Sequence, residues 1–154
     1  MGTSTFSGPV IATNGFVSGS GSLVTADAAT LAVTSAEHSG RTILMDLAGA
    51  QAVTLPAATG TGNVYRFFVK TTITTAHTIT TNGSDIMAGA AIIANDGGAT
   101  ASIFVAATAT VLTMNGTTQG GILGATVELQ DVATATWAVQ YVSSATGAEA
   151  TPFS

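Results

Sequence analysis

The sequence predicts an all-β fold, either a β-sandwich of jelly-roll type or a small barrel. Apolar runs of roughly 4–8 residues recur along the chain, are rich in β-branched residues, and end at Gly, Asn, Asp or Pro. The runs return every ~10–15 residues, which is typical of sandwiches and barrels. No segment keeps a helical period for more than about two turns, although 27–38 could form a helical turn. Strands and turns therefore account for the pattern.

Alternation of apolar and polar residues locates the individual strands. Tyr65 and Phe67 share one face of the predicted strand Val64–Lys70, and Trp137 shares a face with Val139 and Tyr141 in Thr136–Val142. This spacing favours core positions for the aromatic residues over a sugar-binding platform. The other predicted strands are Thr30–Thr34, Arg41–Leu47, Ala52–Leu55, His77–Thr81, Ile86–Ala94 (a strand or a brief helix), Ala101–Ala106, Thr110–Met114 and Thr126–Val132.

Turn residues between the strands indicate how they are connected. Val53–Tyr65 (VTLPAATGTGNVY) has the form of a strand, a turn of small residues and a second strand. Asn82-Gly83 and Asn115-Gly116 are Asn-Gly dipeptides, which suit the positive φ angles of tight hairpins. Ala101–Ala106 and Thr110–Met114 are expected to pair with each other. Asn95-Asp96-Gly97 favours a hairpin turn over a calcium loop, because it lacks the repeated acids of such a loop.

The surface of this protein must be unusually neutral. The chain has 154 residues, which suits one domain, and only 7% of them are charged although 46% are hydrophobic. Charged residues usually make up roughly 25% of a globular protein and keep it soluble. Neutral exposed faces promote association. We therefore expect an oligomer or a component of a lattice.

The charge balance bears on the possible partners. Arg41, Arg66 and Lys70 are the only basic residues, and the net charge is −5. Binding of nucleic acid or of an anionic membrane needs clustered Lys and Arg, so neither partner is expected. Zero cysteines exclude disulfides and thiol chemistry. The N-terminus shows no basic segment followed by an apolar segment, so no signal peptide is expected.

Motifs for catalysis or for cofactors are weak. His38 and His77 lack the spacing of metal ligands, so neither a metal nor another cofactor is expected. No Gly-x-Ser-x-Gly motif is present, and Gly60-Thr61-Gly62 resembles a phosphate loop without the Lys that should follow. We therefore expect that the protein is not an enzyme. A depolymerising enzyme remains the third hypothesis, with two close carboxylates among Asp85, Asp96, Glu128 and Asp131.

The N-terminal part of the chain differs from the rest. We divide the chain into an extended arm, residues 1–23, and an all-β domain, residues 24–154. Isolated apolar residues in a Gly/Ser/Thr background cannot build a core alone. They could dock on a partner by strand addition, or form a first edge strand of the domain's own sheet. The residues that we expect to contact a partner surface or a neighbouring subunit are Phe6, Pro9, Val10, Ile11 and Phe16.

Several short motifs follow one another along the whole chain: TFSGPV and TNGF near the start, VTLPAATGTGNVYRFFV, NGTTQGG, VELQDV and Trp137-Ala138-Val139 further on, and AEATPF at the end. The order of these motifs resembles head decoration (capsid cement) proteins of tailed bacteriophages. The resemblance implies a β-rich homotrimer on the outer capsid surface of the virion, which bridges subunits of the major capsid protein and reinforces the shell. The alternative is a head-fibre or tail-spike module that binds a host surface glycan.

Overall fold

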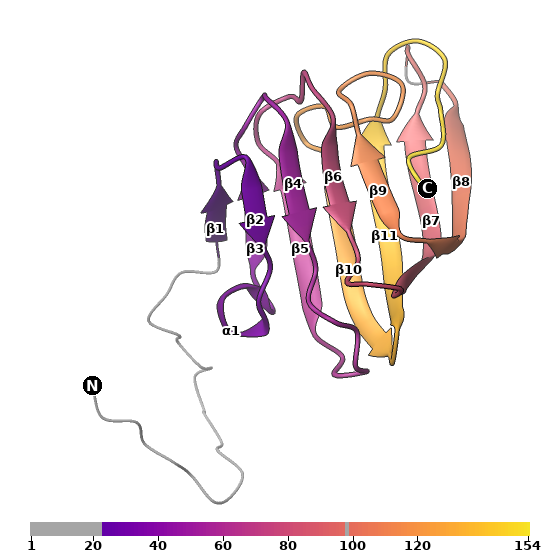
Figure 1. The fold of residues 1–154 in the computed structure, drawn as a ribbon. Helices are drawn as coiled ribbons and strands as arrows, with labels where there is room; N and C mark the ends of the chain where they lie inside the picture. Colours follow the sequence, from indigo (N-terminus) through magenta and orange to yellow (C-terminus); the bar gives the residue numbers. More distant parts are fainter. Residues whose placement is uncertain (1–22, 98) are drawn as a thin grey trace, which may run out of the picture.

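The computed structural model describes residues 23–97 and 99–154, and it confirms the all-β prediction. Within these residues the strands form a large sheet and a small sheet (Figure 1). In spatial order, the large sheet contains β1 (Leu23–Ala26), β3 (Thr42–Met45), β5 (Val64–Val69), β10 (Thr126–Ala133), β11 (Thr136–Ser144), β7 (Ile86–Ala94) and β8 (Ala101–Ala109). The small sheet contains β2 (Thr30–Ala32), β4 (Gln51–Thr54), β6 (His77–Thr80) and β9 (Val111–Met114). A one-turn helix, α1 (Ser35–His38), lies between β2 and β3.

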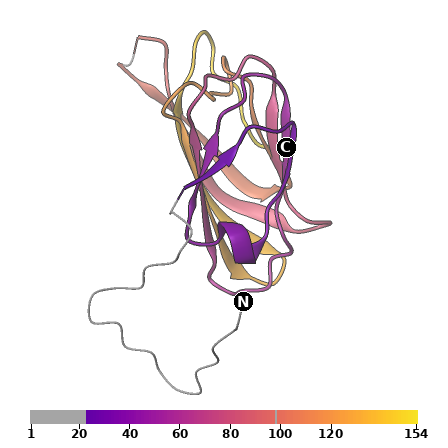
Figure 2. The same ribbon diagram turned by 90° about the vertical axis from the view of Figure 1, so that its left-hand side faces the viewer.

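The two sheets lie face to face as a sandwich (Figure 2). Residues on the inner faces alternate with outward residues along each strand, as the sequence predicts for β3, β5, β10 and β11. Trp137 is fully buried in this core and meets Tyr65 edge to face, with ring centroids 5.6 Å apart. Ile79 and Leu112 pack from the small sheet into the same core. Apolar burial between the sheets is the main stabilising term of the fold.

The first six strands form a coil that alternates between the sheets. β1, β3 and β5 pair in parallel in the large sheet, and β2, β4 and β6 pair in parallel in the small one. Each pass therefore adds one strand to each sheet. The segment Val53–Tyr65 is accordingly a connection that crosses from β4 to β5 in the opposite sheet. β2 to β6 coincide with strands predicted from the sequence, whereas β1 and the parallel pairing were not predicted.

The remaining strands combine hairpins with further crossings. β7 and β8 form the hairpin expected around Asn95, whose amide donates to the carbonyl of Thr100 over 2.9 Å. β10 and β11 form a second hairpin, and β11 also pairs in parallel with β7. The C-terminal segment 151–154 bonds to β9, with the Thr113 amide 2.7 Å from the Pro152 carbonyl. This segment extends the small sheet beyond β9.

The predicted pairing of Ala101–Ala106 with Thr110–Met114 is wrong. β8 continues to Ala109 and pairs with β7, whereas β9 lies in the other sheet against β6. The chain crosses between the sheets at Thr110, whose amide donates to the carbonyl of Ser154 over 2.8 Å. Apolar runs that follow each other closely can belong to facing layers, because alternation shows which side is buried and does not identify the neighbour.

The hairpins predicted at Asn82-Gly83 and Asn115-Gly116 are also wrong. The first dipeptide links β6 to β7 and the second links β9 to β10, so both connect different sheets. Gly83 and Gly116 do adopt positive φ angles, of 55° and 74°. At Gly116 a Cβ atom would lie 1.6 Å from the Ile73 carbonyl oxygen, so only glycine fits this turn. Asn-Gly therefore indicates a tight turn, but it does not show whether the turn joins neighbouring strands or strands of different sheets.

The predicted arm lies almost entirely outside the described residues. β1 begins at Leu23, the last residue assigned to the arm. The five residues expected to contact the capsid or a neighbouring subunit all lie outside the described part of the chain, namely Phe6, Pro9, Val10, Ile11 and Phe16. Residues 23–97 and 99–154 contain no helix with the length and hydropathy needed to cross a membrane.

Candidate interaction surface

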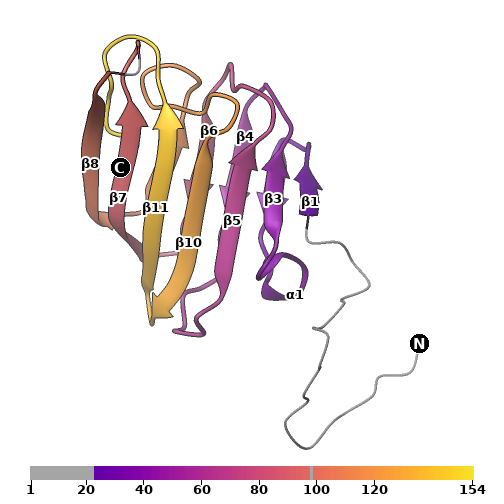
Figure 3. The ribbon, with the colours of Figure 1, turned by 180° about the vertical axis from the view of Figure 1, so that it is seen from behind.

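The candidate site is the outer face of the large sheet, which points away from the small sheet (Figure 3). The charged residues divide this face into two regions. The charged region lies over β3, β5 and β10 and includes Arg66 and Glu128, which are opposite each other in the register of β5 and β10. The uncharged region lies over β11, β7 and β8. No Asp, Glu, Lys, Arg or His occurs in 86–94, 101–109 or 136–144.

The charged region holds two ion pairs. Arg66 Nε lies 2.7 Å from Glu128 Oε2, with side chains 52% and 43% exposed, so water screens the pair and its contribution to stability is small. Lys70 pairs with Asp46 at the end of β3, and the hydroxyl of Thr71 also donates to Asp46 over 2.6 Å. The bond from Lys70 holds the pKa of Asp46 below its usual value. These pairs keep this part of the face hydrated.

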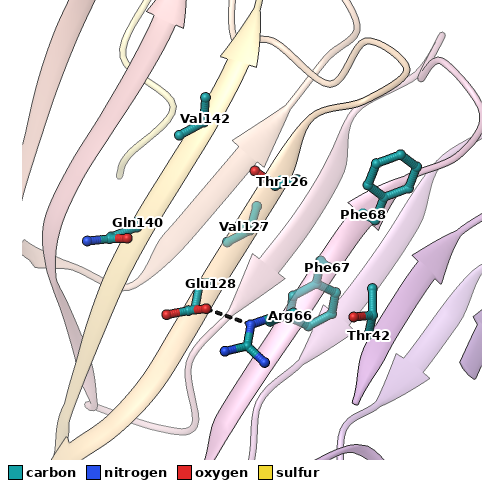
Figure 4. Close-up of a pocket in the computed structure, with 9 residues that line it drawn as sticks. All are labelled: Thr42, Arg66, Phe67, Phe68, Thr126, Val127, Glu128, Gln140 and Val142. Atoms are coloured by element: carbon teal, nitrogen blue, oxygen red, sulfur yellow. Dashed lines mark hydrogen bonds and ion pairs between the residues drawn. The ribbon is translucent and has the colours of Figure 1, made fainter. Parts of the chain in front are cut away.

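A shallow groove of about 390 Å³ crosses the face where the two regions meet (Figure 4). Phe68 and Val142 supply apolar walls, while the Arg66–Glu128 pair supplies the polar side. Thr42, Thr126 and Gln140 line the rest of it together with Phe67 and Val127. Its open shape and its mixture of apolar and polar groups suit a short stretch of another molecule.

The uncharged region exposes large apolar side chains in a continuous strip. In the register of the sheet, Ile103 of β8 lies opposite Ile92 of β7, which lies opposite Val142 of β11. These three side chains are 67%, 45% and 52% exposed, and Val105 beside them is 75% exposed. Scattered apolar residues are ordinary on a surface, but a contiguous strip without charge marks a site of association.

Below this face, Asp131 performs a structural role that the sequence analysis missed. Its carboxylate accepts the backbone amides of Thr59 (3.0 Å), Gly60 (2.6 Å) and Thr61 (3.0 Å), and the Thr61 hydroxyl (2.6 Å). Burial raises the pKa of Asp131, but these donors outweigh burial and hold the pKa below its usual value. The resemblance of Gly60-Thr61-Gly62 to a phosphate loop has a physical basis, because the loop does bind an anion, the carboxylate of its own chain.

Two other acids of the enzyme hypothesis, Asp85 and Glu128, have separate partners. Asp85 accepts the Ala58 amide over 2.7 Å, one residue before the amides held by Asp131, and Glu128 pairs with Arg66 on the outer face. The bonds at Asp85 and Asp131 tie down the connection between β4 and β5. An acid on the buried face of a strand, as at Asp131, was the signal in the sequence that could have identified this role.

Both histidines lie in the folded part of the chain and are buried. His38 closes α1, and its Nδ1 lies 3.1 Å from the Thr34 amide. His77 Nε2 contacts the Gly49 carbonyl, and burial lowers the pKa of this imidazole. Within 23–97 and 99–154, no three His, Asp or Glu side chains are grouped to hold a metal.

The aromatic residues considered for a sugar platform belong to the core. Trp137, Tyr65, Tyr141 and Phe67 are each at most 1% exposed. The hydroxyl of Tyr141 donates to the Gln119 carbonyl over 3.0 Å, and burial raises the pKa of Tyr141 to about 12. The core interpretation is therefore confirmed.

Comparisons of the chain with family models, with curated proteins and with solved structures found no match.

Proposed function

We propose that this protein is a non-enzymatic structural protein of a virion, which binds the outer surface of the capsid as an oligomer and stabilises the shell. Its partners are the major capsid protein and further copies of itself, in a trimer if the resemblance to decoration proteins holds. The observation that carries the proposal is the uncharged region of the large sheet, with Ile92, Ile103, Val105 and Val142 exposed.

A surface of this kind suits a protein that works by adhesion. Apolar contact contributes about 25 cal/mol per Å² of buried area, and threonine, serine and glutamine can bond across an interface without the large desolvation cost of charges. Individually weak contacts become strong when several copies engage the shell at once. Lateral contact between neighbouring copies and contact with the shell together would resist outward pressure.

The test is sedimentation of the full chain with capsids that lack decoration, combined with light scattering of the protein alone. We expect an oligomer that sediments with the shells at fixed stoichiometry and raises the temperature at which they rupture. A monomer that stays in the supernatant at all concentrations would contradict the proposal.

Deleting residues 1–21 tests the role assigned to the arm. The core residues of the sandwich lie between Ala26 and Ala145, so we expect the shortened chain to fold. We expect it to lose its affinity for shells, because Phe6, Val10 and Phe16 are absent. Unchanged occupancy on the shells would show that the arm does not dock there.

The second candidate is a head-fibre or tail-spike module that binds a host surface glycan. The groove favours it, because Phe68 lies beside the polar Arg66–Glu128 pair and sugars bind to such combinations. Titration with host polysaccharide distinguishes the two candidates. Glycan binding that Phe68→Ala abolishes, without binding to shells, would favour the second.

A further inference from the structure

We propose that two copies of this protein pair through β8, strand against antiparallel strand about a two-fold axis, so that their large sheets become continuous. The inference rests on the proposed function, because it adds a two-fold contact through which copies or trimers pair, separate from the contact that would form a trimer. It concerns residues Ala101–Ala106, where β8 keeps an unbroken register with β7.

β8 is an open edge of the sheet. It pairs with β7 on one side, and among the described residues no strand pairs with its other side. An edge strand leaves backbone donors and acceptors available to another strand, and proteins usually protect such edges with lysine, proline or a short length. β8 is nine residues long and contains no charged residue and no proline. None of these protections is present.

The exposure of side chains across the sheet indicates where a strand is missing. Ile92, with neighbours on both sides, is 45% exposed, whereas Ile103 and Val105 on the edge are 67% and 75% exposed. Phe104 points to the opposite face and is only partly buried against the core. A further strand beside β8 would cover Ile103 and Val105 from the side and shield Phe104.

Charge favours a second copy as the occupant. The chain carries a net charge of −5, so two copies repel each other unless they meet where charge is absent. β8, β7 and β11 provide such a surface. A two-fold axis brings Ile103 and Val105 of one copy beside the same residues of the other, and such β-branched cross-strand pairs stabilise antiparallel sheets.

The opposite edge of the large sheet is less suited to this pairing. β1 has only four residues, and Arg41 already donates from Nη2 to the Leu23 carbonyl over 3.0 Å. Contact between β1 of one copy and β8 of another would therefore leave more than half of β8 uncovered. Pairing of β8 with β8 matches two strands of equal length.

Cysteine cross-linking tests the pairing directly, because the natural chain has no cysteine. Opposed residues in antiparallel strands have Cα atoms about 4.5–5.5 Å apart, which a disulfide can span. We expect Ile103→Cys or Val105→Cys to form a disulfide-linked dimer under mild oxidation. If the two-fold axis passes through Phe104, Ile103 of one copy lies opposite Val105 of the other. A mixture of the Ile103→Cys and Val105→Cys chains then forms the disulfide instead. Leu123 is 61% exposed and its amide donates to the Thr72 hydroxyl, beyond the end of β5, so Leu123→Cys is the matched control and should not link.

Lysine substitution tests the energetics. We expect Ile103→Lys with Val105→Lys to weaken the contact by about tenfold or more, since lysine on an edge strand prevents pairing. In light scattering the mass should fall by half, from dimer to monomer or from hexamer to trimer, while Leu123→Lys keeps the natural mass. Circular dichroism should show all three chains folded. An unchanged mass in the double variant, or a natural chain that is a monomer or a simple trimer at all concentrations, would overturn the proposal.

The two proposals fail in different experiments. If the double lysine variant has half the mass and still sediments with shells, both proposals stand and the shell contact lies elsewhere. If the Ile103→Cys or Val105→Cys chain forms the β8 cross-link but the natural chain does not sediment with shells, the proposed function fails and the pairing stands. A cross-link from β8 to a cysteine placed at Phe6, in the absence of any β8–β8 link, would assign the edge to the N-terminal segment and overturn the pairing.

Discussion

The charged and uncharged regions of the large sheet share one face and one core, but they expose side chains of different polarity to water. Over β5 and β10, Arg66 and Glu128 hold each other in solvent. Over β7 and β8, Ile92 and Ile103 stand in the equivalent outward positions. The uncharged region is not poorly packed, because Trp137 and Tyr141 lie fully buried beneath it. The two ends of the sheet therefore present surfaces of different polarity above equally well packed cores.

The largest effect is expected in the charged region, at the bonds between β10 and the connection that leads to β5. Asp131 on β10 holds the connection between β4 and β5 through three amides and one hydroxyl. Asp131→Ala removes the buried carboxylate that accepts these four bonds, and we expect a loss of about 3 kcal/mol in the free energy of unfolding. Urea denaturation measures it. Asp131→Asn retains an acceptor and should lose less; an equal loss would show that packing and not hydrogen bonding is responsible.

An effect on stability of the order of 1 kcal/mol is expected from pH, through His77 on the small sheet. Burial lowers the pKa of His77 below that of the unfolded chain, and bonds to the carbonyls of Gly49 and Leu47 oppose this only in part. The unfolded chain therefore takes up the proton first as the pH falls. Stability should be complete above about pH 7 and should decrease below about pH 6.5.

Denaturation at pH 7 and pH 5 tests this dependence, with His77→Gln as the control. The variant should show a smaller change between the two pH values, whatever its absolute stability. A change of the same size would assign the dependence to another group. Asp131 also makes the protein less stable as the pH falls, but at lower pH values. Because its pKa is lowered in the folded chain, its contribution to stability is lost only below the usual pKa range of a carboxylate.

The smallest effect is expected from the charged region itself. Glu128→Gln removes a solvent-exposed ion pair, and we expect less than about 0.5 kcal/mol of change in stability. The self-association proposed for β8 should likewise be insensitive to salt, because no charged side chain lies on β7, β8 or β11. Sedimentation at low and high salt measures how this self-association depends on salt. Association that weakens steeply with salt would place the contact in the charged region.

Sequence reasoning predicted the elements of the fold better than their arrangement. Alternation at Tyr65, Phe67 and Trp137 was sufficient to assign their buried faces, since that pattern depends on each strand alone. The parallel coil and the placement of β8 and β9 in different sheets depend on partners distant in sequence, which no local pattern encodes.

The candidate surface was predicted only in part. Composition predicted a neutral exterior, but the concentration of that neutrality on three adjacent strands required the strand order, because β7, β8 and β11 are not consecutive along the chain. Ile103 and Val105 were read as residues of an ordinary strand. Their importance comes from lying on its unpaired edge, which is a property of the assembled sheet.

The coil formed by β1 to β6 lies at the opposite end of the large sheet from the edge strand β8. The number of strands in the coil can therefore change without changing β8. Each circuit adds one strand to the large sheet and one to the small sheet, and each new strand needs only the previous one as its template. A homologue with an additional circuit before Leu23 would be wider by one strand spacing, about 4.8 Å, while β8 stayed unchanged. The width of the sandwich and the edge formed by β8 can therefore change independently of each other.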